Sequence, residues 1–335
     1  MHGNGTLARG KVVLCTALCA CLAGGAPALA AQAPAAPVPA TAAALARHVV
    51  LISIDGLRAD AIEAAGAHNL QRLMREGAWT LRAQTILPSK TLPSHTSMLT
   101  GVPPSVHGIT WNENQVGRTG TVGVPTVFDL AEARGLTTAA FFGKEKFRHL
   151  IREETPHFRV APRGDEVWRA SVITQQVEQY LRFRRPDLLF VHLADPDLAG
   201  HMYGWMSLPY RMAVRRADAA VGRLVEAVEE AYGGDAVVIV TADHGGHGRG
   251  HGSAEVVDQT IPWIAWGPGI APGEIAGDIR TFDTAATALW ALGVPLPEQF
   301  AGRPVASAFG AGGVRHAAAP PDESAAGSAR VGARH

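Results

Sequence analysis

The chain has 335 residues, of which 47% are hydrophobic and 18% charged, and this composition excludes an intrinsically disordered or fibrous protein. Lys and Arg together number 30, as do Asp and Glu, so the formal net charge is zero. Because no bulk charge attracts a polyanion, we expect no nucleic-acid polymer as a partner. All three cysteines precede residue 22, so the rest of the chain can form neither a disulfide framework nor a cysteine metal site.

Residues 1–30 are typical of a secretory signal peptide. Arg9 and Lys11 precede an apolar stretch over 12–24, and residues 28–30 read Ala-Leu-Ala, a pattern that signal peptidase cleaves. The alternative, a membrane anchor, needs a longer apolar run. We therefore expect export to the periplasm or beyond the cell, with no membrane span after cleavage. Residues 31–46 are rich in Ala and Pro and predict a flexible linker.

Residues 47–309 show no break in composition and predict one domain, and residues 310–335 predict a disordered tail. Five short runs in the domain are rich in apolar and β-branched residues, as expected for strands: 48–54, 138–142, 187–192, 236–241 and 262–266. Segments with a helical period of apolar residues alternate with them: 59–76, 126–134, 167–183 and 210–231. This alternation predicts an α/β fold with a mainly parallel central sheet and helices on both faces.

Acids and histidines follow three of these predicted strands. Asp55 comes directly after the first strand, Asp197 and His201 follow the third, and Asp243 and His244 follow the fourth. Because the carboxyl ends of parallel strands share one edge of a sheet, we expect the three groups to converge. Each residue alone could be a helix cap or a turn residue. Their joint occurrence at three strand ends favours a metal site.

Asp and His ligands without Cys suit Zn²⁺ or a similar divalent ion. Asp197 and His201 are four residues apart, so one helical turn places both side chains on the same side. The ligands are too many for one tetrahedral ion, and a pair of ions can hold the attacking and leaving oxygens of a phosphoryl transfer. We therefore predict two divalent metal ions, Zn²⁺, as the cofactor. Asp195 precedes a proline, and we predict that it has a structural role in a turn.

The segment 88–101 is dense in hydroxyl groups. Pro93 suits the first turn of a helix over 94–100 that ends at Gly101. Thr91 would then stand just before the helix N-terminus, where the dipole and free N–H groups favour an anion. A hydroxyl beside a divalent cation can lose its proton near neutral pH and attack phosphorus. The same segment also allows Thr91 or Ser94 to be a plain helix cap.

Five short motifs occur in a fixed order over about residues 48–300. They are Ile54-Asp55-Gly56, Lys90-Thr91-Leu92-Pro93-Ser94-His95 with Thr100-Gly101, His107-Gly108-Ile109, Pro196-Asp197 with Gly200-His201, and Thr241-Ala242-Asp243-His244-Gly245. Together they resemble the nucleotide pyrophosphatase/phosphodiesterase family of the alkaline phosphatase superfamily. The resemblance implies an α/β sandwich, two Zn²⁺ ions and a small phosphorylated substrate.

The resemblance also implies which residues hold each ion. One ion would be held by Asp197, His201 and a late histidine. The other would be held by Asp55, Asp243, His244 and the Thr91 hydroxyl. Thr91 would attack phosphorus and form a covalent phospho-enzyme, which water then hydrolyses.

The late histidine is His247 or His251, because no other histidine follows before the predicted tail. The stretch 243–252 resembles short bacterial members, whose ligand is the histidine before the last glycine, so we select His251 and leave His247 to the loop. Asn112 matches by spacing the family asparagine that hydrogen-bonds a phosphoryl oxygen. Lys144 and Lys146 resemble a two-lysine patch of phosphonoacetate hydrolases that binds substrate. A solvated surface pair is the alternative that the sequence favours for both lysines.

Three alternatives to a phosphodiesterase or pyrophosphatase follow from these residues. The same scaffold suits a phosphonatase or a phosphomonoesterase, which would share the metals and the nucleophile. A non-catalytic secreted metal-binding module is the third alternative, and the apparently full set of ligands with a hydroxyl argues against it. A sulfatase is disfavoured, because its formylglycine motif requires Cys or Ser where Thr91 stands and Arg where His95 stands.

Overall fold

A computed structural model describes residues 44–310 apart from 153 and 165, and these residues belong to one compact unit. The predicted signal peptide and disordered tail, and all but the end of the predicted linker, lie outside the described residues and stay predictions. Within the described range, no helix is both long enough and apolar enough to cross a bilayer.

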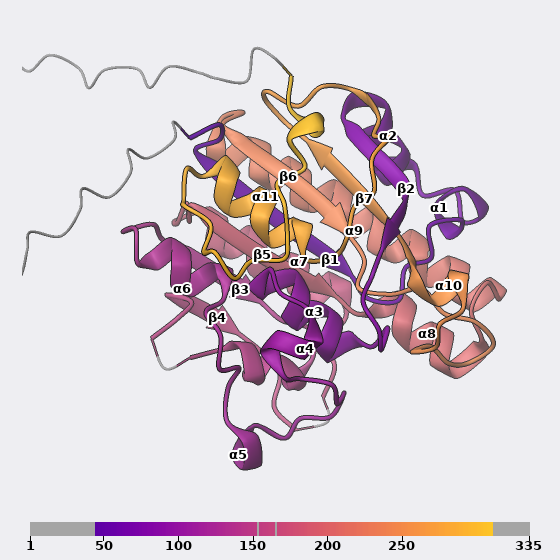
Figure 1. The fold of residues 1–335 in the computed structure, drawn as a ribbon. Coiled ribbons are helices and arrows are strands. Elements are labelled where there is room, and N and C mark those ends of the chain that lie inside the picture. The colour runs from indigo at the N-terminus through magenta and orange to yellow at the C-terminus, as the bar shows by residue number, and fades with distance from the viewer. Residues whose placement is uncertain (1–43, 153, 165, 311–335) are drawn as a thin grey trace, which may run out of the picture. The chain divides into compact units, whose positions relative to one another are not determined.

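An eight-stranded sheet forms the centre of the fold, in the order β4-β3-β5-β1-β6-β7-β2-β8 (Figure 1). Its strands are β1 (His48–Ile54), β2 (Ala78–Gln84), β3 (Thr138–Phe141), β4 (Phe158–Val160), β5 (Leu188–Leu193), β6 (Ala236–Thr241), β7 (Thr260–Trp266) and β8 (Gly273–Glu274). β1 pairs in parallel with β5 and β6, while β7 runs antiparallel to β6 and β2. The predicted mainly parallel sheet is confirmed, and all five predicted strands are present.

Helices cover both faces of the sheet. Figure 1 shows α3 (Thr91–Thr100), α6 (Val127–Glu132) and α11 (Asp283–Ala291) in front of it, with α7 (Ala170–Leu181) and α9 (Leu208–Tyr232) behind. Every residue of β1, β5 and β6 is buried. Their continuous apolar sequences are what strands covered on both faces require.

The predicted helix over 59–76 is wrong as a single element. The chain forms α1 (Ala61–Ala64) and α2 (His68–Glu76), separated at Gly66, whose φ of +65° belongs to the left-handed region that glycine adopts without strain. The remaining short helices are α4 (Pro104–His107), α5 (Val116–Thr119), η1 (Glu145–Leu150), α8 (Asp195–Tyr203), α10 (Val256–Gln259) and η2 (Ala306–Ala308).

Helix α3 begins one turn earlier than predicted. Lys90 has an extended backbone and Thr91 is the first helical residue, so Pro93 is the third. A proline is accepted there because the first N–H groups of a helix have no intrahelical partner. The helix ends as predicted at Gly101, whose φ is +70°.

Asp218 on α9 holds the start of α2. Its carboxylate is buried and accepts hydrogen bonds from the backbone N–H groups of Asn69 and Leu70, at 3.2 and 2.8 Å. The Asn69 side chain donates a further bond of 3.0 Å. The carboxylate thus acts as a helix cap supplied by a residue far away in the sequence.

We predict that Asp218→Ala lowers the free energy of unfolding by about 2–3 kcal/mol, because buried N–H donors lose their acceptor. Asp218→Asn keeps one acceptor oxygen and should lose less. Urea unfolding followed by circular dichroism measures both, with the exposed Glu230→Ala on the same helix as a control. Equal stability of Asp218→Ala and Glu230→Ala would show that the cap contributes nothing.

Candidate metal centre

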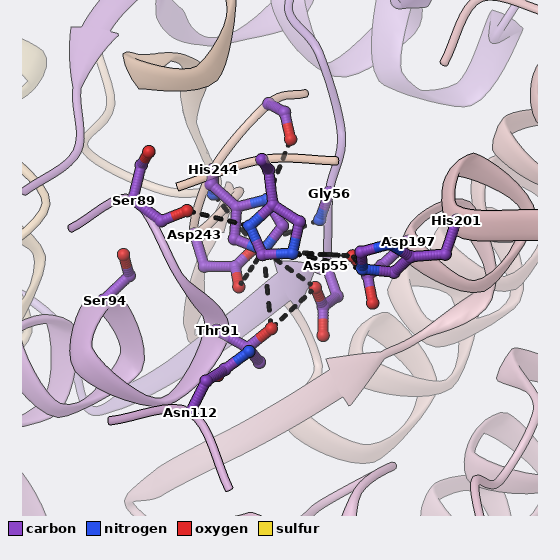
Figure 2. Close-up of polar contacts among 12 residues, drawn as sticks. Asp55, Gly56, Ser89, Thr91, Ser94, Asn112, Asp197, His201, Asp243 and His244 are labelled. Atoms are coloured by element: carbon purple, nitrogen blue, oxygen red, sulfur yellow. Dashed lines mark hydrogen bonds and ion pairs between the residues drawn. The ribbon is translucent and has the colours of Figure 1, made fainter. Parts of the chain in front are cut away.

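Three adjacent strand ends bring the predicted carboxylates together. Asp55 follows β1, Asp197 lies in the first turn of α8 after β5, and Asp243 follows β6. The Asp197 N–H donates to the Asp55 carbonyl at 3.0 Å, and the Gly56 N–H donates to Asp243 Oδ1 at 3.0 Å. Figure 2 shows the three carboxylates facing one another. The predicted convergence at one edge of the sheet is therefore present.

Gly56 makes this close approach possible. Its φ is +70°, and a Cβ atom at this position would lie 2.9 Å from the Asp197 Cα atom. Any larger residue would push the end of β1 away from α8. The glycine of the Ile-Asp-Gly motif is thus explained by packing between two ligand-bearing segments.

Asp197, His201 and His251 form one group. The His201 and His251 Nε2 atoms are 3.2 Å apart, and they lie 3.3 and 3.6 Å from Asp197 Oδ1. The Nδ1 atoms face backbone carbonyls, Arg249 O at 3.0 Å and Ser89 O at 2.9 Å, so they carry hydrogen. Two neutral rings would therefore present lone pairs to each other, and a proton or a metal cation must stand between them.

Asp55, Asp243 and His244 form the second group. His244 Nδ1 donates to Gly245 O at 2.8 Å, while Nε2 lies 3.4 Å from Asp55 Oδ1 and 3.2 Å from Asp243 Oδ2. The Thr91 hydroxyl completes the group, 3.5 Å from Asp55 Oδ1 and 3.4 Å from His244 Nε2. All these side chains are buried.

His244 stands between the two groups. Its ring stacks on that of His251 with centroids 3.6 Å apart, and Nε2 lies 4.0 Å from Asp197 Oδ1. Two sets of ligand atoms lie within 4.8 Å of one another, and His244 belongs to both: Asp197, His244 and His251, and Asp55, Asp243 and His244. The two groups are therefore one continuous centre.

The donors present fit metal ions. Asp197 Oδ1 and Asp243 Oδ2 are buried and accept no hydrogen bond from any residue that the structure describes. A buried carboxylate oxygen without a partner is costly unless a cation binds it. Three imidazoles, those of His201, His244 and His251, also direct Nδ1 at a carbonyl and Nε2 at carboxylates. Metal-binding histidines use this arrangement, and nitrogen with oxygen donors suits Zn²⁺.

Positive charge is held strongly in this centre. Burial raises the pKa of Asp55, but the Lys144 ammonium and a hydrogen bond from His192 outweigh it and hold the pKa well below its usual value. Burial and the Asp55 charge raise the pKa of Asp197, and Lys144 leads the groups that lower it overall. Burial lowers the pKa of His244, but the carboxylates, Asp243 first, raise it to about 9. Lys144 therefore keeps the carboxylates of Asp55 and Asp197 ionised, and the carboxylates in turn favour the protonated form of His244.

Lys144 lies inside the centre. It is 6% exposed, and Nζ is 2.6 Å from Asp55 Oδ2 and 2.5 Å from Asp197 Oδ2. The alternative of a solvated surface charge is therefore wrong for Lys144. Lys146 is half-buried, and burial and the Lys144 charge lower its pKa. Binding of substrate by either lysine stays a prediction.

The side chain of Asn112, which follows α3 in the chain, contacts the first turn of that helix. Its Oδ1 accepts a hydrogen bond of 2.9 Å from the Leu92 N–H, which fixes the amide so that Nδ2 remains a donor. Figure 2 places Asn112 beside Thr91. The resemblance to the family thus singled out a residue that the fold brings to Thr91, and its role toward a phosphoryl oxygen stays a prediction.

Two other predicted residues lie outside the ligand groups found among the described residues. His247 Nδ1 contacts Asp258 Oδ1 at 2.8 Å, and its ring is 42% exposed. Asp195 starts α8 instead of forming a turn, and its Oδ2 accepts the N–H of Ala170 at 2.6 Å, at the start of α7. The contact of Asp195 is therefore structural, but it joins α8 to the start of α7 and does not form a turn.

Three buried polar residues behind the carboxylates, His192, His95 and Ser53, were not predicted as parts of the site. His192 Nδ1 accepts the Gly143 N–H at 3.2 Å, so Nε2 donates to Asp55 Oδ2 at 2.9 Å. His95 Nδ1 donates to the Thr91 carbonyl at 2.8 Å, and Nε2 accepts from the Ser53 hydroxyl at 2.7 Å. A polar residue inside an apolar strand was the available signal for His192 and Ser53.

Comparison with known proteins decides the family. A family model described as type I phosphodiesterase / nucleotide pyrophosphatase matches residues 49–249, more than half of the chain. The chain belongs to this family. The match confirms the resemblance to the alkaline phosphatase superfamily. A sulfatase family model also matches residues 208–294, the part of the chain from α9 to α11.

The curated relatives of this family member include enzymes of several kinds. GPI ethanolamine phosphate transferase 1 of Candida glabrata is 28% identical over 67% of the chain and 27% of its own length. Human ectonucleotide pyrophosphatase/phosphodiesterase family member 7 is 26% identical over 71% of the chain and 54% of its length. Venom phosphodiesterase of Macrovipera lebetinus is 26% identical over 59% of the chain and 25% of its length. The chain thus spans about a quarter to a half of these relatives.

Solved structures share the fold. Murine ectonucleotide pyrophosphatase / phosphodiesterase 5 superposes with a TM-score of 0.63 at 14% identity, over 75% of this chain and 96% of that one. BT1596, a 2-O GAG sulfatase, gives 0.63 at 15% identity, over 79% and 74%. These similarities confirm the α/β architecture of the family.

We predict that His192→Ala weakens Zn²⁺ binding by about 10- to 100-fold, because Asp55 loses the donor that orients it. His192→Gln keeps a donor and should recover part of the affinity. Competition with a chelating dye measures the affinity of each variant for Zn²⁺. His48→Ala, a buried histidine at the opposite end of β1, is the control. If both alanine variants bound Zn²⁺ as the unmodified protein does, the orienting role of His192 would be refuted.

Proposed function

We propose that this protein is an exported phosphodiesterase or nucleotide pyrophosphatase that uses two divalent metal ions, Zn²⁺, and Thr91 as nucleophile. The observation that carries the proposal is the Thr91 hydroxyl, buried at the N-terminus of α3 and within 3.5 Å of both Asp55 and His244. Family membership supports a phosphoester substrate. Export rests on the sequence of residues 1–30 alone.

The ligand groups described above suit two ions. Asp197, His201 and His251 would hold one. Asp55, Asp243, His244 and the Thr91 hydroxyl would hold the other. When bound, the ions supply positive charge that lowers the pKa of an adjacent hydroxyl and balances charge developing on phosphoryl oxygens.

Thr91 performs the bond-making step. Its Oγ1 attacks phosphorus, the bond from phosphorus to the leaving oxygen breaks, and the leaving group departs with the electron pair. The hydroxyl proton passes to solvent, and the leaving alkoxide or phosphate takes one back. Water then attacks phosphorus, the bond to Oγ1 breaks, and Thr91 regains its proton, so the net reaction consumes one water.

The start of α3 orients the phosphoryl group. The free N–H groups and dipole of a helix N-terminus bind anions, and Thr91 is the first residue of a ten-residue helix. Asn112 has its amide fixed by the Leu92 N–H, so its Nδ2 is directed as a further donor. These fixed donors favour the charge that builds up on the phosphoryl oxygens in the transition state.

Three further reactions stay open on this scaffold: hydrolysis of a phosphonate, hydrolysis of a phosphomonoester, and phosphoryl transfer to an alcohol. The buried ammonium of Lys144 adds a positive charge that a dianionic monoester or a phosphonate would use, which supports the phosphonatase or phosphomonoesterase alternative. The similarity to GPI ethanolamine phosphate transferases supports the third reaction, in which an alcohol instead of water accepts the phosphoryl group from Thr91.

We predict that Thr91→Ala lowers kcat for a nitrophenyl phosphodiester at least about a thousandfold, because the nucleophile is lost. Bound zinc, measured by elemental analysis, should remain. Thr100→Ala on the same helix is the control, since its hydroxyl donates to the Thr96 carbonyl. Near-normal turnover by Thr91→Ala would exclude it as the nucleophile.

Metal removal gives a second test. We predict that EDTA abolishes hydrolysis and that Zn²⁺ restores it, because unneutralised carboxylates would repel an anionic substrate. Relative rates on a diester, a monoester and phosphonoacetate separate the candidate reactions, and product formed on an added alcohol detects transfer. Full activity in EDTA, with no metal bound, would rule out the metal-dependent mechanism.

A further inference from the structure

We propose that Trp205 is a positioning residue that holds the ligands of the Asp197 ion site and thereby sets the affinity of that site for its metal. The Asp197 ion site consists of Asp197, His201 and His251. The inference rests on the proposed function, and it adds a residue that belongs to none of the five sequence motifs. Trp205 lies in the turn between α8 and α9 and is 7% exposed.

The indole of Trp205 packs against both histidines of this site. Its ring centroid lies 5.2 Å from that of His201, edge to face, and 5.8 Å from that of His251. These separations are in the range in which aromatic rings attract one another. The His201 side chain is 47% exposed, so the buried indole gives its ring a fixed surface to rest on. Both imidazoles are therefore oriented by contact with the same residue.

Two glycines make room for the indole. A Cβ atom at Gly200, directly before His201, would lie 2.6 Å from an indole atom, and one at Gly246 would lie 2.3 Å from one. Neither glycine has a positive φ, so the backbone conformation does not require glycine at these positions. The close approach of Trp205 does. The backbone of α8 and that of the loop before His251 thus pack directly on the indole.

Hydrogen bonds join Trp205 to the other segments that carry ligands. Its Nε1 donates to the Gly56 carbonyl at 3.0 Å, just after β1, and its backbone N–H donates to the Gly248 carbonyl at 2.8 Å, in the loop after β6. The Tyr210 hydroxyl donates to the same Gly56 carbonyl at 2.8 Å. Trp205 therefore contacts the segments after β1, β5 and β6, which carry every predicted ligand apart from Thr91.

The turn that carries Trp205 has a strained backbone. Met206 has a φ of +64° and is the one residue other than glycine with a positive φ in the part of the chain that the structure describes. Residues with a side chain rarely adopt this region, and the strain persists only where surrounding contacts fix the backbone. The contacts of Trp205 on either side of the turn supply that fixation. The position of the indole is thus determined by tertiary contacts and not by the local sequence.

A buried tryptophan also stabilises a fold, so a purely structural role is the alternative. A structural residue would affect the two ions alike, in step with the stability of the whole protein. A positioning residue that packs on His201 and His251 would affect the Asp197 ion site more than the group of Asp55, Asp243 and His244. The difference between the two affinities therefore separates the two roles.

The test measures zinc binding by Trp205→Ala and Trp205→Phe in the full chain, by competition with chelating dyes of different strengths and by elemental analysis. We expect Trp205→Ala to lower one of the two affinities by about 10- to 100-fold and to leave the other within about threefold. Trp205→Phe keeps a ring but loses the donor to Gly56, so its loss should be smaller. Trp290→Ala, on α11 beside the start of β1, is the control and should bind both ions normally.

His201→Ala identifies which affinity has changed. This variant lacks a ligand of the Asp197 ion site, so the affinity that it loses is the one that Trp205→Ala should also lose. Because both variants act on the same site, the double variant should lose less than the sum of the two separate effects. A full sum, with the Trp205 effect on the other ion, would place the role of Trp205 elsewhere and overturn the inference.

Gly200→Ala tests the same contact without removing the tryptophan, and it decides the inference if Trp205→Ala does not fold. Alanine favours a helix over glycine, but here its methyl group would meet the indole. We expect Gly200→Ala to weaken the Asp197 ion site and to weaken it less in combination with Trp205→Phe, whose smaller ring leaves room. Gly117→Ala, on α5 with open space around it, is the matched control.

Unchanged zinc affinities in the Trp205 and Gly200 variants would overturn the inference. An equal fall at both sites that follows the loss of melting temperature would also overturn it, since that result is expected of a structural residue. Neither result contradicts the proposed function, because the unmodified protein would still bind two ions and hydrolyse the phosphodiester. An unmodified protein that binds no zinc would refute the proposed function and the inference together.

Discussion

The concentration of negative charge at the end of three adjacent strands is the constraint on which the rest of this structure depends. Asp55, Asp197 and Asp243 are buried together, and each ion removed from water carries a penalty of several kcal/mol unless opposite charge compensates it. Lys144 and the histidines supply part of that compensation. Two carboxylate oxygens remain without a hydrogen bond from any described residue, so the compensation by side chains is incomplete.

This constraint explains features that are otherwise unrelated. β1 lies between β5 and β6, which places the three carboxylates in one row. Gly56 has no side chain because Asp197 occupies the space. His201, His244 and His251 each bond a backbone carbonyl through Nδ1, so all three direct Nε2 at the acids. The hydroxyl of Thr91, the first residue of α3, contacts the same cluster. A charge arrangement that is costly for folding is thereby useful for holding cations beside a nucleophile.

The local sequence was sufficient to predict the buried strands and the acidic residues at their ends. Continuous apolar runs identified β1, β5 and β6, and the acids that follow them lie together because parallel strands share their carboxyl ends. Thr91 and Asn112 were identified by resemblance to a family and not by any periodicity. β2 was missed although its burial alternates, because its short pattern gains meaning only from its antiparallel partner β7.

Features that depend on long-range contacts were beyond prediction. The ion pairs of Lys144 join residues more than 50 positions apart in the sequence, and no pattern in the sequence around Lys144 indicates them. The helix break at Gly66 depends on one backbone angle.

Anomalous X-ray diffraction at the zinc absorption edge, on crystals of protein purified without chelators, tests whether the buried carboxylates and histidines hold two zinc ions. We expect two peaks, one among Asp197, His201 and His251 and one among Asp55, Asp243 and His244. Well-ordered carboxylates with no anomalous peak beside them, in protein supplied with zinc, would contradict it.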